Sequence, residues 1–296
     1  MTASRLPQIV TALAIGATLS AGSVPAASAA PAYTEYVALG DSYSADATLT
    51  QITTQFVPEG CVQSSRDYPK QVAAALNVPV FRDATCSSAK TVDMVGSQSP
   101  LVGPPNPPQF DRLTPTTDLV TVGIGGNDID LMSAALRCGS PTAFGSPCKD
   151  RWTINGVDKI SVNIANAQAK IVGTLDGVRE RSPRARILLV NFMAGVTPGV
   201  SCYPMVPIAD GDALWLADKL IELNAMLASA ASQVGVELVD TYSGSLGHDA
   251  CQPPGVRWVE GLIPFSADPP GLAVPLHPNQ LGADFQARSV LAAVND

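Results

Sequence analysis

Short apolar runs of strand-type residues alternate with longer amphipathic patterns along most of this 296-residue chain. The runs predict strands at 36–39, 78–82, 119–123, 186–191 and 236–239. The patterns between them predict helices at about 68–76, 157–181, 211–234 and 279–294. Buried strands that alternate with helices form a mainly parallel sheet with helices on both faces. The sequence therefore predicts an α/β fold, in which a binding site is expected at the carboxyl ends of the strands.

The N-terminus has the pattern of an export signal. Arg5 precedes an apolar run at 9–22, and Ala27-Ser28-Ala29 fits a small-x-small cleavage site. We therefore expect residues 1–30 to be removed and residues 31–296 to form a single secreted or cell-wall-associated domain. The alternative is a membrane anchor, but the run is shorter than the roughly 20 apolar residues of a spanning helix. No stable membrane anchor is expected.

All six cysteines follow this segment, and an even number in an exported chain suggests three disulfides. Sequence alone cannot choose among the possible pairings. The simplest one joins nearest neighbours: Cys61–Cys86, Cys138–Cys148 and Cys202–Cys251. A zinc site is the alternative, but the chain has no C-x-x-C motif and only two histidines. No metal and no cofactor are expected.

The charge of the chain excludes one class of partner. Lys and Arg number 18 and Asp and Glu number 26, which gives a net charge of −8. Such a surface repels phosphate backbones, so no nucleic-acid partner is expected.

Three polar side chains stand where predicted elements end or begin. Ser42 follows the strand at 36–39, Asn127 follows two glycines after the strand at 119–123, and His277 precedes the last helix. A serine nucleophile needs an imidazole base, and a neutral amide can donate to a developing oxyanion. The alternatives are a helix cap or turn for Ser42 and a turn asparagine at 127. The other histidine, His248, lies close to Cys251 and is expected to be structural.

These positions form three blocks in a fixed order: Gly40-Asp41-Ser42, Gly125-Gly126-Asn127-Asp128 and His277-Pro278-Asn279. Together they resemble the SGNH (GDSL) hydrolase family, and most of all the secreted lipases and esterases of Streptomyces and related actinobacteria. The resemblance implies a three-layer α/β/α sandwich with a five-stranded, mainly parallel sheet of flavodoxin type. A classical α/β-hydrolase is excluded because no Gly-x-Ser-x-Gly motif occurs in the chain.

The resemblance also implies a role for each site residue. Ser42 is expected to form an acyl-enzyme, and His277 is expected to act as its general base. The oxyanion hole would use the Ser42 N–H, the Asn127 side chain and a second backbone N–H. That second donor is usually a glycine, but Ser88 stands at this position. A positive φ angle there is harder for serine than for glycine.

A second departure from the family concerns the group that orients the histidine. The family commonly has an aspartate three residues before it, where this chain has Val274. Some actinobacterial relatives use a main-chain carbonyl instead, so the resemblance implies that the Val274 carbonyl orients His277. Asp268 is the nearest upstream acid and the less favoured candidate.

The resulting expectation is a secreted serine esterase or lipase that acts as a monomer on small-molecule or lipid esters. An alternative of the same class is a deacylase of cell-wall polysaccharides, plant polysaccharides or phospholipids. An alternative of another class is a non-catalytic surface-binding protein on the same scaffold. Family resemblance alone does not choose the substrate.

Overall fold

The computed structural model describes residues 1–2, 33–45, 49–263, 265–267 and 270–295. The chain divides into two units, Met1–Ala30 and Pro31–Asp296, and every described helix and strand belongs to the second. Apart from its first two residues, the signal sequence expected at 1–30 lies outside the described residues, so its removal stays a prediction. Within the described ranges, no helix is both long enough and apolar enough to cross a bilayer.

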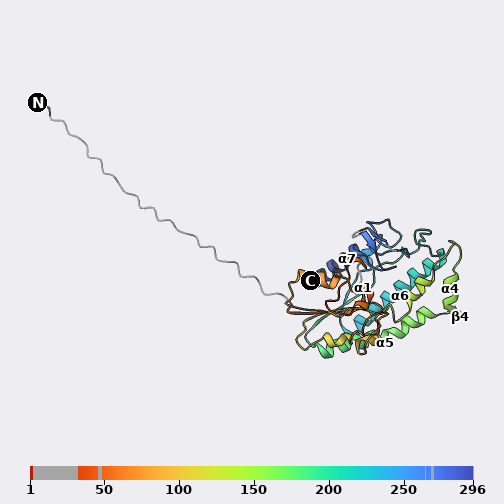
Figure 1. Cartoon of the computed structure of the whole chain (residues 1–296), viewed down its shortest axis with the longest axis horizontal. Helices are drawn as coiled ribbons and strands as arrows, with labels where there is room; N and C mark the ends of the chain where they lie inside the picture. The colour runs from red at the N-terminus through yellow and green to blue at the C-terminus, as the bar shows by residue number, and fades with distance from the viewer. Residues whose placement is uncertain (3–32, 46–48, 264, 268–269, 296) are drawn as a thin grey trace. The chain divides into compact units, whose positions relative to one another are not determined.

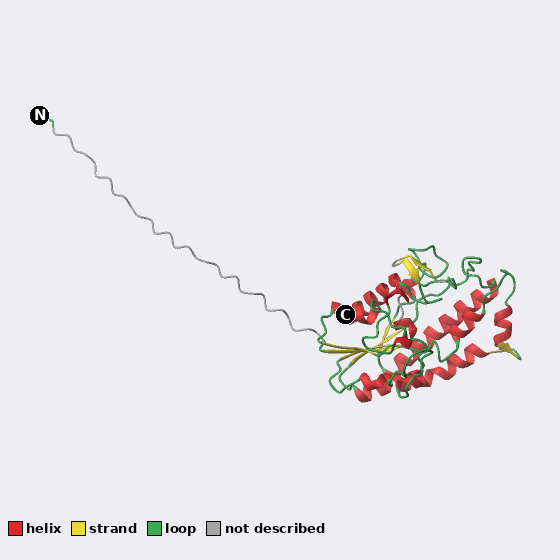
Figure 2. Cartoon of the chain, viewed as in Figure 1, coloured by secondary structure: helices red, strands yellow, loops and turns green. Residues whose placement is uncertain are grey.

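A five-stranded sheet forms the centre of the second unit, with strand order β2-β1-β3-β6-β7. Its strands are β1 (Glu35–Gly40), β2 (Val80–Asp83), β3 (Leu119–Gly123), β6 (Arg186–Val190) and β7 (Glu237–Val239). All pairings are parallel, and every residue of β1 and β3 is buried. Figure 2 shows these strands between the helices. The predicted α/β class is confirmed.

Four long helices cover the two faces of this sheet (Figure 1). They are α2 (Tyr68–Ala75), α5 (Lys159–Arg181), α6 (Asp210–Val234) and α7 (Gln280–Asn295). Val37 and Leu39 of β1 belong to one core together with α5 and α6, whereas Tyr36 and Ala38 belong to a second core with α2 and α7. Successive strand side chains point to opposite faces, so the two cores lie on opposite sides of the sheet. The predicted three-layer sandwich is confirmed.

Local sequence signals set the ends of these helices. The Asp158 side chain accepts hydrogen bonds from the N–H groups of Ile160 and Ser161 and so caps the start of α5. Such a cap is worth about 1 kcal/mol. Gly235 ends α6 in the left-handed region, with φ at 72°, where glycine is favoured because it has no Cβ.

Short elements fill the connections and were not predicted. The helices among them are α1 (Ser42–Ala45), α3 (Leu131–Arg137) and α4 (Pro147–Trp152). The strands are β4 (Thr153–Ile154), β5 (Val157–Asp158), β8 (Phe265–Ala267) and β9 (Pro270–Leu272). Short 3₁₀ turns lie at Leu49–Gln51, Glu59–Cys61, Thr91–Met94, Gln109–Arg112 and Ser243–Ser245. Elements this short carry too few residues for a hydrophobic period to appear.

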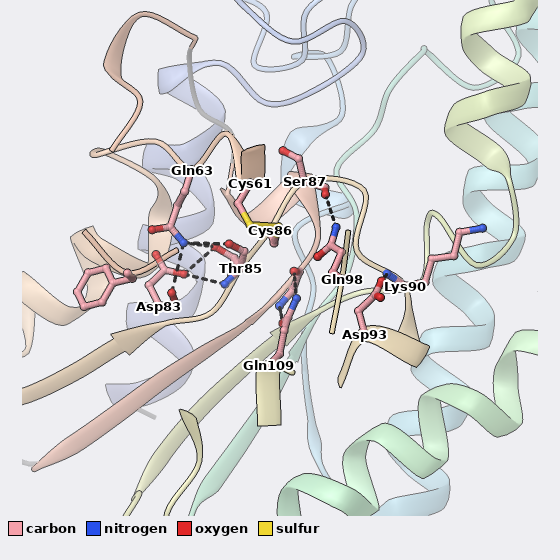
Figure 3. The surroundings of a disulfide bond; sticks show 12 residues. Cys61, Gln63, Asp83, Thr85, Cys86, Ser87, Lys90, Asp93, Gln98 and Gln109 are labelled. Carbon is pink, nitrogen blue, oxygen red and sulfur yellow. Dashed lines mark hydrogen bonds between the residues drawn. A yellow bond between two sulfur atoms is a disulfide. The ribbon is translucent and has the colours of Figure 1, made fainter. Parts of the chain in front are cut away.

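Three disulfides join the cysteines as nearest neighbours: Cys61–Cys86, Cys138–Cys148 and Cys202–Cys251. Figure 3 shows the first of these beside the buried polar side chains Gln63 and Thr85. Gln63 donates to the Thr85 carbonyl at 2.9 Å. The disulfide and this bond together fix the segment that follows β2, at the carboxyl edge of the sheet.

Candidate active site

Ser42 is held at the carboxyl end of β1 by a tight contact between two strands. Gly40 of β1 pairs with Gly123 of β3, and a Cβ on Gly40 would lie only 2.6 Å from the Gly123 carbonyl oxygen. The Asp41 N–H donates to that same oxygen at 2.9 Å. Only glycine allows this approach, and α1 then begins with Ser42 at the sheet edge.

Gln109, the first residue of the 3₁₀ turn at Gln109–Arg112, reinforces the turn at Gly40 (Figure 3). Its side-chain oxygen accepts from the Gly40 N–H at 2.8 Å, and its side-chain nitrogen donates to the Gly40 carbonyl at 2.9 Å. The Cys86 N–H donates to the same carbonyl at 3.1 Å. The sequence analysis did not single out Gln109, because no motif or hydrophobic period marks its segment.

His277 lies directly against Ser42, although 235 residues separate them in the sequence. The Ser42 Oγ is 2.6 Å from the His277 Nε2. The two residues are only 9% and 4% exposed. The loop before α7 is held by the Glu260 N–H, which donates to the His277 carbonyl at 2.9 Å. The structure therefore brings together the two residues expected to act as nucleophile and base.

The orienting carbonyl belongs to Pro275, so the expectation of Val274 is wrong by one residue. The His277 Nδ1 lies 2.7 Å from the Pro275 carbonyl oxygen. The Val274 carbonyl instead accepts from the His277 backbone N–H at 3.3 Å. Leu276 has a φ of 55°, and the turn through it leaves the Pro275 carbonyl facing the imidazole. The alternative acid, Asp268, lies outside the described residues.

This contact fixes the protonation state of the imidazole. A carbonyl oxygen can only accept, so the His277 Nδ1 carries the hydrogen, and Nε2 is left free to accept from Ser42. Burial lowers the pKa of His277 from its ordinary 6.5 to about 4, and the Pro275 carbonyl offsets only part of that shift. The imidazole is therefore neutral at pH 7 and can accept a proton.

Asn127 comes four residues after the end of β3. It lines the same cavity as Ser42 and His277. Its side-chain nitrogen donates to the Ala89 carbonyl at 3.1 Å, which fixes the direction of the amide. An amide nitrogen carries two hydrogens, so one remains for a ligand.

Ser88 lies in the left-handed region, with φ at 65°. This conformation costs a residue with a Cβ about 1–2 kcal/mol. Its neighbours fix it, because the Ser87 N–H donates to the Cys61 carbonyl and the Ala89 N–H donates to the Cys86 carbonyl. Ser88 is not one of the residues that line the cavity at Ser42.

A cavity opens at Ser42, with about 700 Å³ of empty space when the solvent at its mouth is included. Asp41, Ser42, Asn127 and His277 are polar side chains among its lining residues, and most of the other lining residues are apolar. The apolar lining includes Leu131, Met132 and Ala135 of α3, and Leu216, Ala217, Leu220 and Leu223 of α6. Sequence reasoning missed this lining because α3 was not predicted and α6 was expected only to cover the sheet.

The other residues of metal-binding type are engaged elsewhere. His248 stacks on Trp258, with ring centroids 3.8 Å apart, and its Nδ1 lies 2.7 Å from the Val256 carbonyl oxygen. This agrees with the structural role expected for it. In the part of the chain that the structure describes, no group of three or more His, Cys, Asp or Glu side chains could hold a metal ion.

Comparison with known proteins agrees with this geometry. The model of the GDSL-like lipase/acylhydrolase family matches residues 38–285. The chain belongs to this family. The protein is a carboxylic ester hydrolase.

Two relatives and two solved structures show how far the likeness extends. The GDSL hydrolase is 37% identical to "Lipase 2" of Streptomyces coelicolor, over 91% of this chain and 88% of that protein. It is 28% identical to "Esterase" of Streptomyces scabiei, over 96% of this chain and 93% of that protein. An extracellular lipase from Streptomyces rimosus matches with a TM-score of 0.64 at 25% identity, over 88% and 99% of the two chains. A phospholipase A1 from Streptomyces albidoflavus shares the fold with a TM-score of 0.68 at 22% identity, over 88% and 99%.

Proposed function

We propose that this GDSL hydrolase cleaves esters through an acyl-enzyme on Ser42, with His277 as general base and then general acid. The observation that carries the proposal is the 2.6 Å contact between the Ser42 Oγ and the His277 Nε2. The tautomer set by Pro275 gives this nitrogen a free lone pair. All of these groups come from one chain, so a monomer is sufficient.

The reaction follows from this arrangement in two balanced steps. The Ser42 oxygen attacks the ester carbonyl while its proton passes to the His277 Nε2, and the collapsing intermediate expels the alcohol with that proton. Water then attacks the acyl-enzyme and gives a proton to the same nitrogen. The second intermediate collapses to release the carboxylic acid, and that proton returns to the Ser42 oxygen. The Pro275 carbonyl holds the ring in place throughout, but it carries no charge and stabilises the imidazolium less than an aspartate would.

The oxyanion of each intermediate would be bound by the backbone N–H of Ser42 and the side chain of Asn127. We expect Asn127→Ala to lower kcat about 10²–10³-fold with little change in KM, because the negative charge exists only in the transition state. Asn163→Ala is a matched control, since it removes a side-chain amide bond to the Ile129 carbonyl outside the cavity lining. An unchanged kcat in folded Asn127→Ala would remove this residue from the oxyanion hole.

We infer that an acyl chain longer than acetyl enters the cavity, because the lining of the cavity is mostly apolar. Ala135 is buried in this lining on α3, so Ala135→Phe would fill the space meant for the chain. We expect this variant to lower kcat/KM for p-nitrophenyl octanoate at least tenfold and to leave p-nitrophenyl acetate nearly unaffected. Leu136→Phe is the control, because Leu136 is the exposed neighbour. Equal losses on both esters would contradict an acyl pocket.

This lining bears on the alternatives. A deacylase that removes short acyl groups from polysaccharides needs no apolar cavity, whereas a lipid ester does, so the lining favours lipid-type esters, phospholipids included. A purely binding protein is disfavoured, because it has no need of a buried, neutral histidine aligned on a serine.

The proposal places the enzyme outside the cell after removal of residues 1–30. Three disulfides among the described residues support this, because such bonds persist in oxidising compartments. The relative from Streptomyces rimosus is described as an extracellular lipase, which supports it further.

A further inference from the structure

Asp41 stands next to Ser42 but has no part in the reaction described above. Its side chain lines the same cavity as Ser42, although the residue is only 1% exposed. One carboxyl oxygen, Oδ1, accepts from the Tyr43 N–H at 3.0 Å and thereby caps α1. Capping does not require a charge, because serine, threonine and asparagine perform it as well. A buried carboxyl group at this position therefore needs another explanation.

The second carboxyl oxygen of Asp41 provides an explanation for the buried carboxyl group. Oδ2 is buried and has no hydrogen-bond partner among the residues that the structure describes, which is costly for an acceptor. It faces Gly126, where an added Cβ would lie 3.8 Å from it. The Gly126 N–H is one of the groups that act on this carboxyl. Contacts of this kind are often long in a free enzyme and tighten when the substrate binds.

Asp41 thus touches both halves of the site. Its backbone N–H donates to the Gly123 carbonyl at the end of β3, and its side chain faces Gly126, which directly precedes Asn127. We propose that Asp41 is a positioning residue whose carboxylate holds the Gly126–Asn127 turn at a fixed distance from Ser42. The proposal rests on the proposed function, because it matters only if Ser42 and Asn127 act together on an ester.

The charge state of Asp41 should therefore affect the rate. Only the carboxylate can accept on both oxygens, since protonation turns one of them into a donor. Burial raises the pKa of Asp41 to about 7, and the Asp128 carboxylate acts in the same direction. We expect kcat to fall as the pH drops through about 7, because the protonated acid loses the contact with Gly126.

The other titratable groups that line the cavity are not expected to titrate near pH 7, so the step in kcat of Asp41 can be told apart from theirs. Asp128 accepts a hydrogen bond from Thr91 at 3.0 Å and faces Lys170 at 3.8 Å. Of the other titratable groups that line the cavity, His277 loses its proton near pH 4. Burial raises the pKa of Tyr43 well above its ordinary range. A step in kcat near pH 7 that is present in the wild type and absent in Asp41→Asn would thus belong to Asp41.

The test is Asp41→Asn. The amide keeps the oxygen that caps α1 and has almost the same volume, but its nitrogen cannot accept from Gly126. We expect kcat to fall about 10- to 100-fold with little change in KM, and the step near pH 7 to disappear. The control is Asp158→Asn, which changes the cap of α5 and should leave kcat and its pH profile unchanged. A wild-type kcat and pH profile in folded Asp41→Asn would overturn the proposal.

A double-mutant cycle with Asn127→Ala separates positioning from general destabilisation. If Asp41 acts through Asn127, Asp41→Asn should cost less than about threefold on the Asn127→Ala background, whereas full additivity would contradict the proposal. Should Asp41→Asn fail to fold, Asp41→Ser keeps an oxygen that can cap α1 but has no second acceptor for Gly126, and a wild-type kcat in folded Asp41→Ser would overturn the proposal. Turnover that survives Ser42→Ala would instead refute the proposed function itself.

Discussion

Replacement of Ser42 by alanine is expected to lower kcat for p-nitrophenyl esters by about 10⁶-fold. The loss of a nucleophile removes covalent catalysis, and only the oxyanion donors and substrate binding remain. KM should change little, because the Ser42 hydroxyl contributes little to binding of the ground state. Initial rates of the purified mature enzyme at saturating ester give both constants.

Ser44→Ala is the matched control for this variant. Ser44 lies two residues further along α1 and is buried as well, and its hydroxyl contacts the Tyr68 hydroxyl at 3.4 Å rather than the cavity. Its kcat should stay within a few fold of wild type. A loss in Ser44→Ala as large as that in Ser42→Ala would show that the variants damage the turn rather than the chemistry.

Replacement of His277 by alanine is expected to have an effect of similar size, because nucleophile and base work as one unit. For the same reason, the double variant Ser42→Ala/His277→Ala should be scarcely slower than either single one. His248→Ala is the control and should keep its kcat, since His248 stacks on Trp258 away from Ser42. If the loss in kcat of the double variant equalled the product of the two single losses, Ser42 and His277 would act independently, which would contradict this prediction.

The pH dependence offers a second view of His277. The base must be neutral, and burial lowers its pKa to about 4. The limb of kcat/KM that belongs to His277 should therefore lie near pH 4, with activity lost as the pH drops through that value. A limb near 6.5 that persists in Asp41→Asn would show that the imidazole is solvated in the working enzyme.

The sheet and its long helices could be predicted because their signals are local and repeated. A strand such as β3 is a continuous apolar run, and a helix such as α5 repeats its apolar stripe over several turns. The short helix α3 and the hairpin of β8 and β9 gave no such signal. Their conformations depend on contacts with distant segments, as when β9 packs against the turn at Leu49–Gln51.

The residues of the site could be predicted from the sequence, but some of their contacts could not. Ser42 and Asn127 follow buried strands, and parallel strands bring their carboxyl ends to one edge, so their proximity follows from the fold. The choice between Val274 and Pro275 as the orienting carbonyl could not be predicted, because it depends on the positive φ of Leu276. The apolar cavity was equally hidden, since it arises where α3 approaches α6.

The most direct test of the account is covalent trapping of the nucleophile. The mature enzyme is treated with an alkyl fluorophosphonate until turnover stops and is then digested, and the modified peptide is identified by mass spectrometry. We expect one phosphonate per molecule, attached to Ser42, and no labelling of the Ser42→Ala variant. A phosphonate on a different serine, or complete inactivation without any adduct on Ser42, would contradict it.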